Sequence, residues 1–157
     1  MRRQLVLAGA AAGVLATVLP LTAFASHGAR RAQDVSVTLG TAKKNDFPAE
    51  FRIDARQLRP AQFGKPSILQ PGATTFTFRN ASGEKLPHNF TIVAASPGGS
   101  RFKSRTLPGG QSQQLTVNLK PGSYIAVCTV FNGSHWAEGM IKVFTVGTQD
   151  TKTGAWK

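Results

Sequence analysis

One loop near the C-terminal end of the chain contains three residues that bind soft metal ions, Cys128, His135 and Met140. A thiolate, a neutral imidazole and a thioether together favour copper above all, because hard cations prefer oxygen ligands. A trigonal copper site uses two histidines and one cysteine, with a long and weak methionine contact on its axis. The loop lacks one of these histidines, and His88 is the obvious candidate.

Residues of these types are scarce, which strengthens this interpretation. The 157 residues include one Cys, two Met and three His. Once the initiator Met and His27, near a predicted processing site, are set aside, the four candidate ligands are the residues that remain. Each of them alone is explained as well by packing, because cysteine and methionine are common core residues and many histidines are satisfied core or surface residues. Their grouping favours one metal site.

Residues 1–25 are typical of a secretory signal peptide. Two arginines precede a mostly apolar stretch, and Ala23-Phe24-Ala25 matches a small-residue cleavage signal. The stretch is short for a membrane span and contains Pro20, so an uncleaved anchor is the weaker alternative. We therefore expect export to the periplasm or the extracellular side of the cytoplasmic membrane, without stable membrane insertion, and a flexible leader at residues 26–33.

The rest of the chain is long enough for one domain with a single core. The whole chain has a formal net charge of +12, and its Lys and Arg residues are spread along the sequence. This spread favours a generally positive surface over a nucleic-acid groove. We therefore expect no nucleic-acid partner, and faster association with redox proteins that have acidic surfaces. A merely soluble basic surface is the alternative.

Hydrophobic patterns predict strands on both sides of the candidate ligands. Some segments alternate polar and apolar residues, others are rich in β-branched and aromatic residues, and Pro-Gly turns separate two of them. The predicted strands are 34–39, 51–55, 74–79, 88–93, 114–119, 123–127 and 141–146. Residues 96–110 contain many Gly and Pro residues and are predicted to be a surface excursion rather than core. No segment has sustained helical periodicity, so we predict an all-β, mainly antiparallel sandwich of seven or eight strands.

Three parts of the sequence together resemble the cupredoxins, a family of small blue-copper electron carriers. They are Pro87-His88-Asn89-Phe90, the Pro-Gly-x-Tyr lead into Cys128, and the Cys…His…Gly-Met loop. The resemblance covers residues 34–147, which form the predicted domain, and leaves a polar C-terminal tail at 148–157. It implies a Greek-key β-sandwich with one type 1 copper ion near one end. The ligands that it implies are His88, Cys128, His135 and Met140.

The resemblance also implies roles for residues around the ion. Asn89 would link the two ligand segments by hydrogen bonds near the Cys128 sulfur. His135 would be the ligand at the solvent edge, with an apolar contact patch around it made of Leu86, Phe131 and Trp136. The spacer of six residues between Cys128 and His135 is longer than in the best-known members, so the geometry of the site does not follow from the resemblance.

These observations predict an electron carrier rather than an enzyme. Enzymes with several copper centres need further histidines, and only His27 remains after His88 and His135 are assigned. A copper storage or delivery protein would use the same ligands without a redox role, and a metal-free adhesion domain would leave their grouping unexplained. We expect a monomer that makes weak, transient contacts with redox partners such as cytochromes or a terminal oxidase or reductase.

Overall fold

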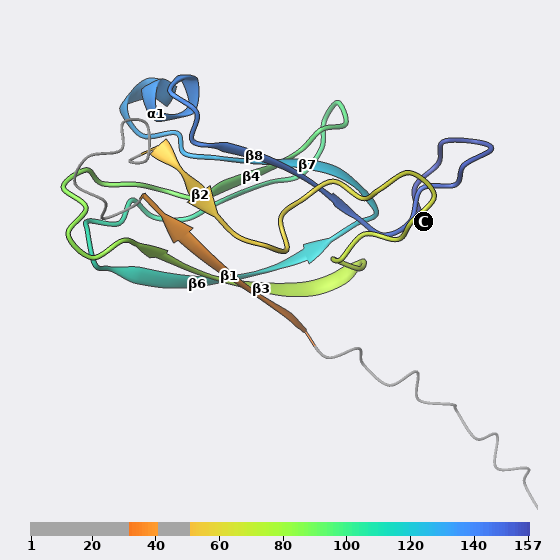
Figure 1. Cartoon of the computed structure of the whole chain (residues 1–157), viewed down its shortest axis with the longest axis horizontal. Helices are drawn as coiled ribbons and strands as arrows, with labels where there is room; N and C mark the ends of the chain where they lie inside the picture. Colours follow the sequence, from red (N-terminus) through yellow and green to blue (C-terminus); the bar gives the residue numbers. More distant parts are fainter. Residues whose placement is uncertain (1–31, 41–50) are drawn as a thin grey trace, which may run out of the picture.

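Two four-stranded sheets face each other in the computed structural model, which describes residues 32–40 and 51–157 (Figure 1). The first sheet has the order β2-β1-β3-β6, and the second has the order β5-β4-β7-β8. The strands of the first sheet are β1 (Gln33–Leu39), β2 (Ile53–Asp54), β3 (Gly72–Asn80) and β6 (Ser112–Leu119). Those of the second are β4 (Thr91–Ala94), β5 (Arg101–Lys103), β7 (Gly122–Val127) and β8 (Ile141–Val146). The predicted all-β sandwich is confirmed.

Alternation of polar and apolar residues decides which face of each strand is buried. In β3, residues Thr74, Phe76, Phe78 and Asn80 are buried, while the residues between them are more exposed. β1 runs parallel to β3 in full register, whereas the other strand pairs of the described residues are antiparallel. The inward face of the first sheet therefore presents a mainly apolar surface to the second sheet, with the polar Thr74 and Asn80 toward the two ends of β3.

Phe90 joins the two layers directly beside the candidate ligand His88. Its ring lies 5.6 Å from that of Phe76 and 5.5 Å from that of Phe78, measured between ring centroids. All three rings are fully buried. Burial of an aromatic side chain of this size contributes about 1.5–3 kcal/mol to stability. The chain before β4 is thus anchored in the core two residues after His88.

The segment 96–110 differs from the prediction that it lies on the surface. β5 extends the second sheet, and Leu107 is 0% exposed and belongs to the core. His88 and Leu107 exchange two backbone hydrogen bonds, of 3.0 and 2.7 Å, in an isolated bridge before β4 begins. The prediction failed because Leu107 is a single apolar residue among glycines and prolines, so no hydrophobic pattern indicates that the chain returns to the core there.

The ends of the sandwich differ (Figure 1). One end holds two short helical turns, η2 (Phe131–Gly133) and α1 (Ser134–Ala137), and the C-terminal segment folds back at the other end. There, the backbones of Thr148 and Lys157 exchange hydrogen bonds of 3.0 and 2.9 Å. The predicted signal peptide and nearly all of the predicted leader lie outside the described residues. No helix of the described part is long and apolar enough to cross a membrane.

Candidate metal centre

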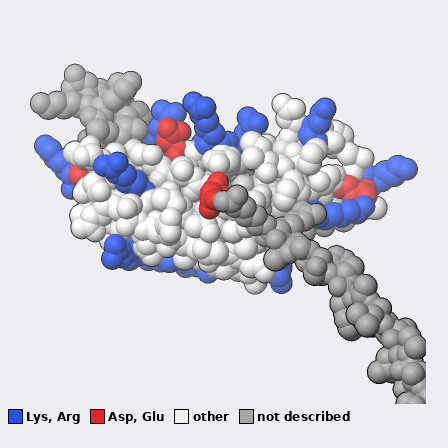
Figure 2. Space-filling model, turned by 90° about the horizontal axis from the view of Figure 1, so that it is seen from below, with Lys and Arg blue, Asp and Glu red and all other residues white. Residues whose placement is uncertain are grey.

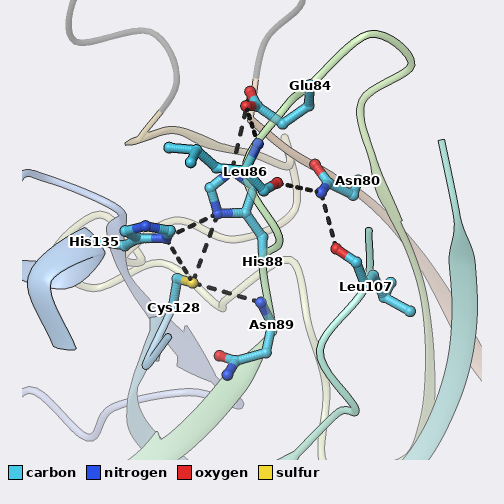
Figure 3. Close-up of polar contacts among 8 residues, drawn as sticks. All are labelled: Asn80, Glu84, Leu86, His88, Asn89, Leu107, Cys128 and His135. Atoms are coloured by element: carbon cyan, nitrogen blue, oxygen red, sulfur yellow. Dashed lines mark hydrogen bonds and ion pairs between the residues drawn. The ribbon is translucent and has the colours of Figure 1, made fainter. Parts of the chain in front are cut away.

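Three buried side chains from two segments, the one before β4 and the connection between β7 and β8, meet at the end of the sandwich that holds α1 (Figure 3). The Nδ1 atoms of His88 and His135 lie 3.1 Å apart. The sulfur of Cys128 lies 3.8 Å from Nδ1 of His88 and 3.5 Å from Nδ1 of His135. The structure therefore brings the imidazole of His88 to the thiol and imidazole of a loop that lies 40 or more residues further along the chain.

The size of this triangle fits a single metal ion. Metal bonds of about 2.0–2.1 Å to nitrogen and about 2.3 Å to sulfur, spread at about 120° around one ion, place two nitrogens about 3.5 Å apart and a nitrogen and sulfur about 3.8 Å apart. The observed separations of 3.1, 3.5 and 3.8 Å are close to these values. Two imidazoles and a thiolate are also the donor set of trigonal copper sites.

Strand register places Cys128 beside the other two segments. β4 pairs with β7 so that Thr91 lies opposite Val127, and β7 pairs with β8 so that Val127 lies opposite Ile141. Cys128 directly follows β7 and Met140 directly precedes β8, and the Cys128 N–H donates to the Met140 carbonyl at 3.1 Å. The geometry of the site thus depends on pairing between strands, not on the loop alone.

The long spacer before His135 folds into a tight turn. Phe131, Asn132 and Gly133 have φ values of 51°, 54° and 88°, three successive residues in the left-handed region. For an aromatic residue this conformation is uncommon and costs on the order of 1–3 kcal/mol. The turn leads into α1, which contains His135, and the N–H of Met140, three residues after α1, donates to the His135 carbonyl at 2.9 Å. The spacer therefore reverses direction and places the His135 imidazole at this end of the sandwich.

Met140 is fully buried in the core cluster that also contains Cys128. Its backbone is hydrogen-bonded to both Cys128 and His135, so it lies next to two members of the triangle. Its role as an axial ligand stays a prediction. Glu138, the acidic residue of the same loop, is exposed and does not belong to the group of candidate ligand side chains found among the described residues.

Asn89 ties the two ligand segments together, as the resemblance implied. Its Oδ1 accepts hydrogen bonds from the Thr129 backbone N–H at 2.8 Å and from the Thr129 hydroxyl at 3.3 Å. Its own backbone N–H donates to the Cys128 sulfur at 3.5 Å. Burial raises the pKa of the Cys128 thiol, and N–H groups of Asn89 and Val130 oppose that rise because they stabilise the thiolate.

Both histidines are held in the neutral form that binds metals. The pKa of His88 is lowered to about 4, mainly by burial and to a smaller extent by the nearby His135. Burial also lowers the pKa of His135, although Glu138 and Glu84 oppose that change. Near neutral pH both imidazoles are therefore uncharged and offer a nitrogen lone pair without first losing a proton.

His135 is more deeply buried than its predicted position at the solvent edge implies. His135 is 3% exposed, and its ring packs edge-on against Phe51 and Phe131 at centroid distances of 5.0 and 5.2 Å. Phe131 is 60% exposed and Trp136 is 53% exposed. The imidazole thus lies just beneath an exposed aromatic surface, rather than in it.

Glu84 is a residue near the site that sequence reasoning missed. It is 8% exposed, and its Oε2 lies 4.0 Å from Nε2 of His88 (Figure 3). Near Glu84, the side-chain NH₂ group of Asn80 donates to the carbonyls of Leu86 and Leu107, each at 2.9 Å. The one available signal was an acidic residue close to His88 in a chain with only seven Asp and Glu residues.

No family model and no curated protein matches the chain. Solved structures do match it. Auracyanin B is 18% identical, with a TM-score of 0.54 over 73% of this chain and 88% of its own. Reduced rusticyanin is 18% identical, with a TM-score of 0.50 over 72% and 77%. Auracyanin A, a "blue" copper protein from the green thermophilic photosynthetic bacterium Chloroflexus aurantiacus, is 18% identical, with a TM-score of 0.50 over 73% and 99%. The chain has the cupredoxin-like fold.

Proposed function

We propose that this chain is an exported type 1 (blue) copper protein that carries single electrons between redox partners. The observation on which the proposal depends is the buried triangle of His88, Cys128 and His135, whose size and donor types suit one copper ion. The fold supports it, since two of the similar structures are named as rusticyanin and as a "blue" copper protein.

The residues present account for the main requirements of such a carrier. Bound copper would supply a Cu(II)/Cu(I) couple. The thiolate of Cys128 would favour the reduced ion, the two imidazoles would suit both oxidation states, and Met140 would supply a fourth, weaker ligand. The four residues are buried, and the hydrogen bonds of Asn89 hold two ligand segments in place. A site fixed in this way limits rearrangement when the charge of the ion changes.

Electron exchange would take place at the end of the sandwich that holds α1. Exposed Phe131 and Trp136 lie there, and Phe131 packs directly on the ring of His135. On the face shown in Figure 2, Lys and Arg side chains are scattered instead of forming one patch. We infer a monomer whose partners are redox proteins with a small apolar contact area and an acidic surface, and whose encounters are brief. Its proposed place is the periplasm or the extracellular side.

Visible absorption of the Cu(II)-loaded protein tests this proposal. We expect an intense thiolate-to-copper charge-transfer band that is lost in Cys128→Ser and kept in His27→Ala, a control that changes the one histidine that is not a candidate ligand. A pale spectrum typical of oxygen and nitrogen ligands alone would contradict the proposal. A blue protein that exchanges electrons slowly with a cytochrome but passes copper readily to a chelator would instead be a storage or delivery protein.

A further inference from the structure

A buried carboxylate faces the histidine that lies before β4. Oε2 of Glu84 is 4.0 Å from Nε2 of His88, and their side chains are 3% and 0% exposed. Neither atom has a hydrogen-bond partner among residues 32–40 and 51–157. A buried carboxylate and a buried ring nitrogen are each costly to leave unpaired. At 4.0 Å, each group is therefore a candidate hydrogen-bond partner for the other.

The protein holds this carboxylate in position. The Leu86 N–H donates to Oε1 of Glu84 at 3.0 Å, which leaves Oε2 directed at the imidazole (Figure 3). Gly40, whose φ is 71°, packs against the same carboxylate, and a Cβ there would lie 2.7 Å from Oε2. A Cβ on Gly109 would collide with the backbone carbonyl of Glu84. Two glycines thus leave room for Glu84 on either side.

The two nitrogens of His88 face different groups. Nδ1 points at the sulfur of Cys128 and the ring of His135, whereas Nε2 points at Glu84 (Figure 3). A ligand that binds through Nδ1 must carry its proton on Nε2, and metal-bound histidines nearly always donate that proton to a carboxylate, a carbonyl or water. The separation of 4.0 Å is about 1 Å longer than a hydrogen bond, so the two side chains must move closer by about that distance for the bond to form.

We propose that Glu84 is a positioning residue for the metal centre, which accepts the Nε2–H of His88 and favours Cu(II) over Cu(I). The proposal rests on the function proposed above. The hydrogen bond fixes the tautomer that presents Nδ1 to the ion. The charge of Glu84 acts on the redox balance, because Cu(II) with one thiolate keeps a net positive charge that the carboxylate neutralises, whereas Cu(I) with one thiolate is already neutral.

Two substitutions separate the hydrogen bond from the charge. Glu84→Gln keeps the shape and an oxygen acceptor but removes the charge, and Glu84→Met removes both. Glu138→Gln is the matched control, since it removes a carboxylate that is exposed at the same end of the molecule. Solvent screens the exposed carboxylate far more than the buried one.

The first measurement needs no copper. Nitrogen-15 NMR of the metal-free protein at neutral pH reports which ring nitrogen of His88 carries the proton. We expect the Nε2–H tautomer in the wild type, in Glu84→Gln and in Glu138→Gln, and a shift toward Nδ1–H in Glu84→Met. A wild type protonated on Nδ1, or an unchanged tautomer in Glu84→Met, would overturn the proposal.

The second measurement compares Cu(II) and Cu(I) binding. We expect Glu84→Gln to weaken Cu(II) relative to Cu(I) by about tenfold, equal to a rise of about 59 mV in the one-electron potential. Glu138→Gln should change the ratio less, because the exposed Glu138 carboxylate is screened by solvent although it also acts on His135. Equal changes in the two variants would overturn the specific role of Glu84. A tautomer that depends on Glu84 in a protein without the blue band would instead refute the proposed function and leave the Glu84–His88 hydrogen bond standing.

Discussion

Removal of the Asn89 side chain should loosen the connection between the two ligand segments. Asn89→Ala deletes the acceptor of two hydrogen bonds from Thr129, at 2.8 and 3.3 Å, but keeps the backbone N–H that faces the Cys128 sulfur. The shorter bond involves a backbone N–H and is worth about 1–1.5 kcal/mol. The longer one comes from a half-buried hydroxyl that can turn to water, so it is worth less. We expect a loss of about 2 kcal/mol in the free energy of unfolding.

Denaturant unfolding of the metal-free protein measures this loss, and thermal unfolding should show a melting temperature lower by about 6 °C. Asn118→Ala is the control, because Asn118 is an exposed asparagine on β6, and its effect should stay within about 0.5 kcal/mol. If Asn89→Ala is no more destabilising than Asn118→Ala, the side chain does not tie the segments together and the reasoning fails.

Two further predictions concern the stability of the metal-free protein. The pKa of His88 is about 4 in the folded protein and 6.5 in its ordinary state, so between these pH values the unfolded chain binds one proton more than the folded protein. The free energy of unfolding should therefore be full above pH 6.5 and fall by about 3 kcal/mol as the pH drops toward 4. Urea unfolding across that range checks this, and His88→Gln should flatten the slope. Leu107→Ala should cost about 2–5 kcal/mol because Leu107 is fully buried in the core, whereas a surface residue, as first predicted, would give almost no loss in the same assay.

The strands and the candidate ligands could be predicted because their signals are local or compositional. Alternation along 74–79 and 114–119 predicts strands whose inward residues pack on a core, and β3 and β6 lie there. The grouping of Cys128, His135 and Met140 in one loop, in a chain with few such residues, predicts a soft-metal site. That these residues bind copper stays a prediction.

Tertiary structure alone decided which distant residues surround these side chains. Register between β4 and β7 sets the distance from His88 to Cys128, and the left-handed turn at Phe131 sets the position of His135. Leu107 and Glu84 have no periodic pattern around them, and each is buried because chain segments far away in the sequence close over it. Sequence patterns report which face of a segment is apolar, whereas contacts between segments depend on how the whole chain packs.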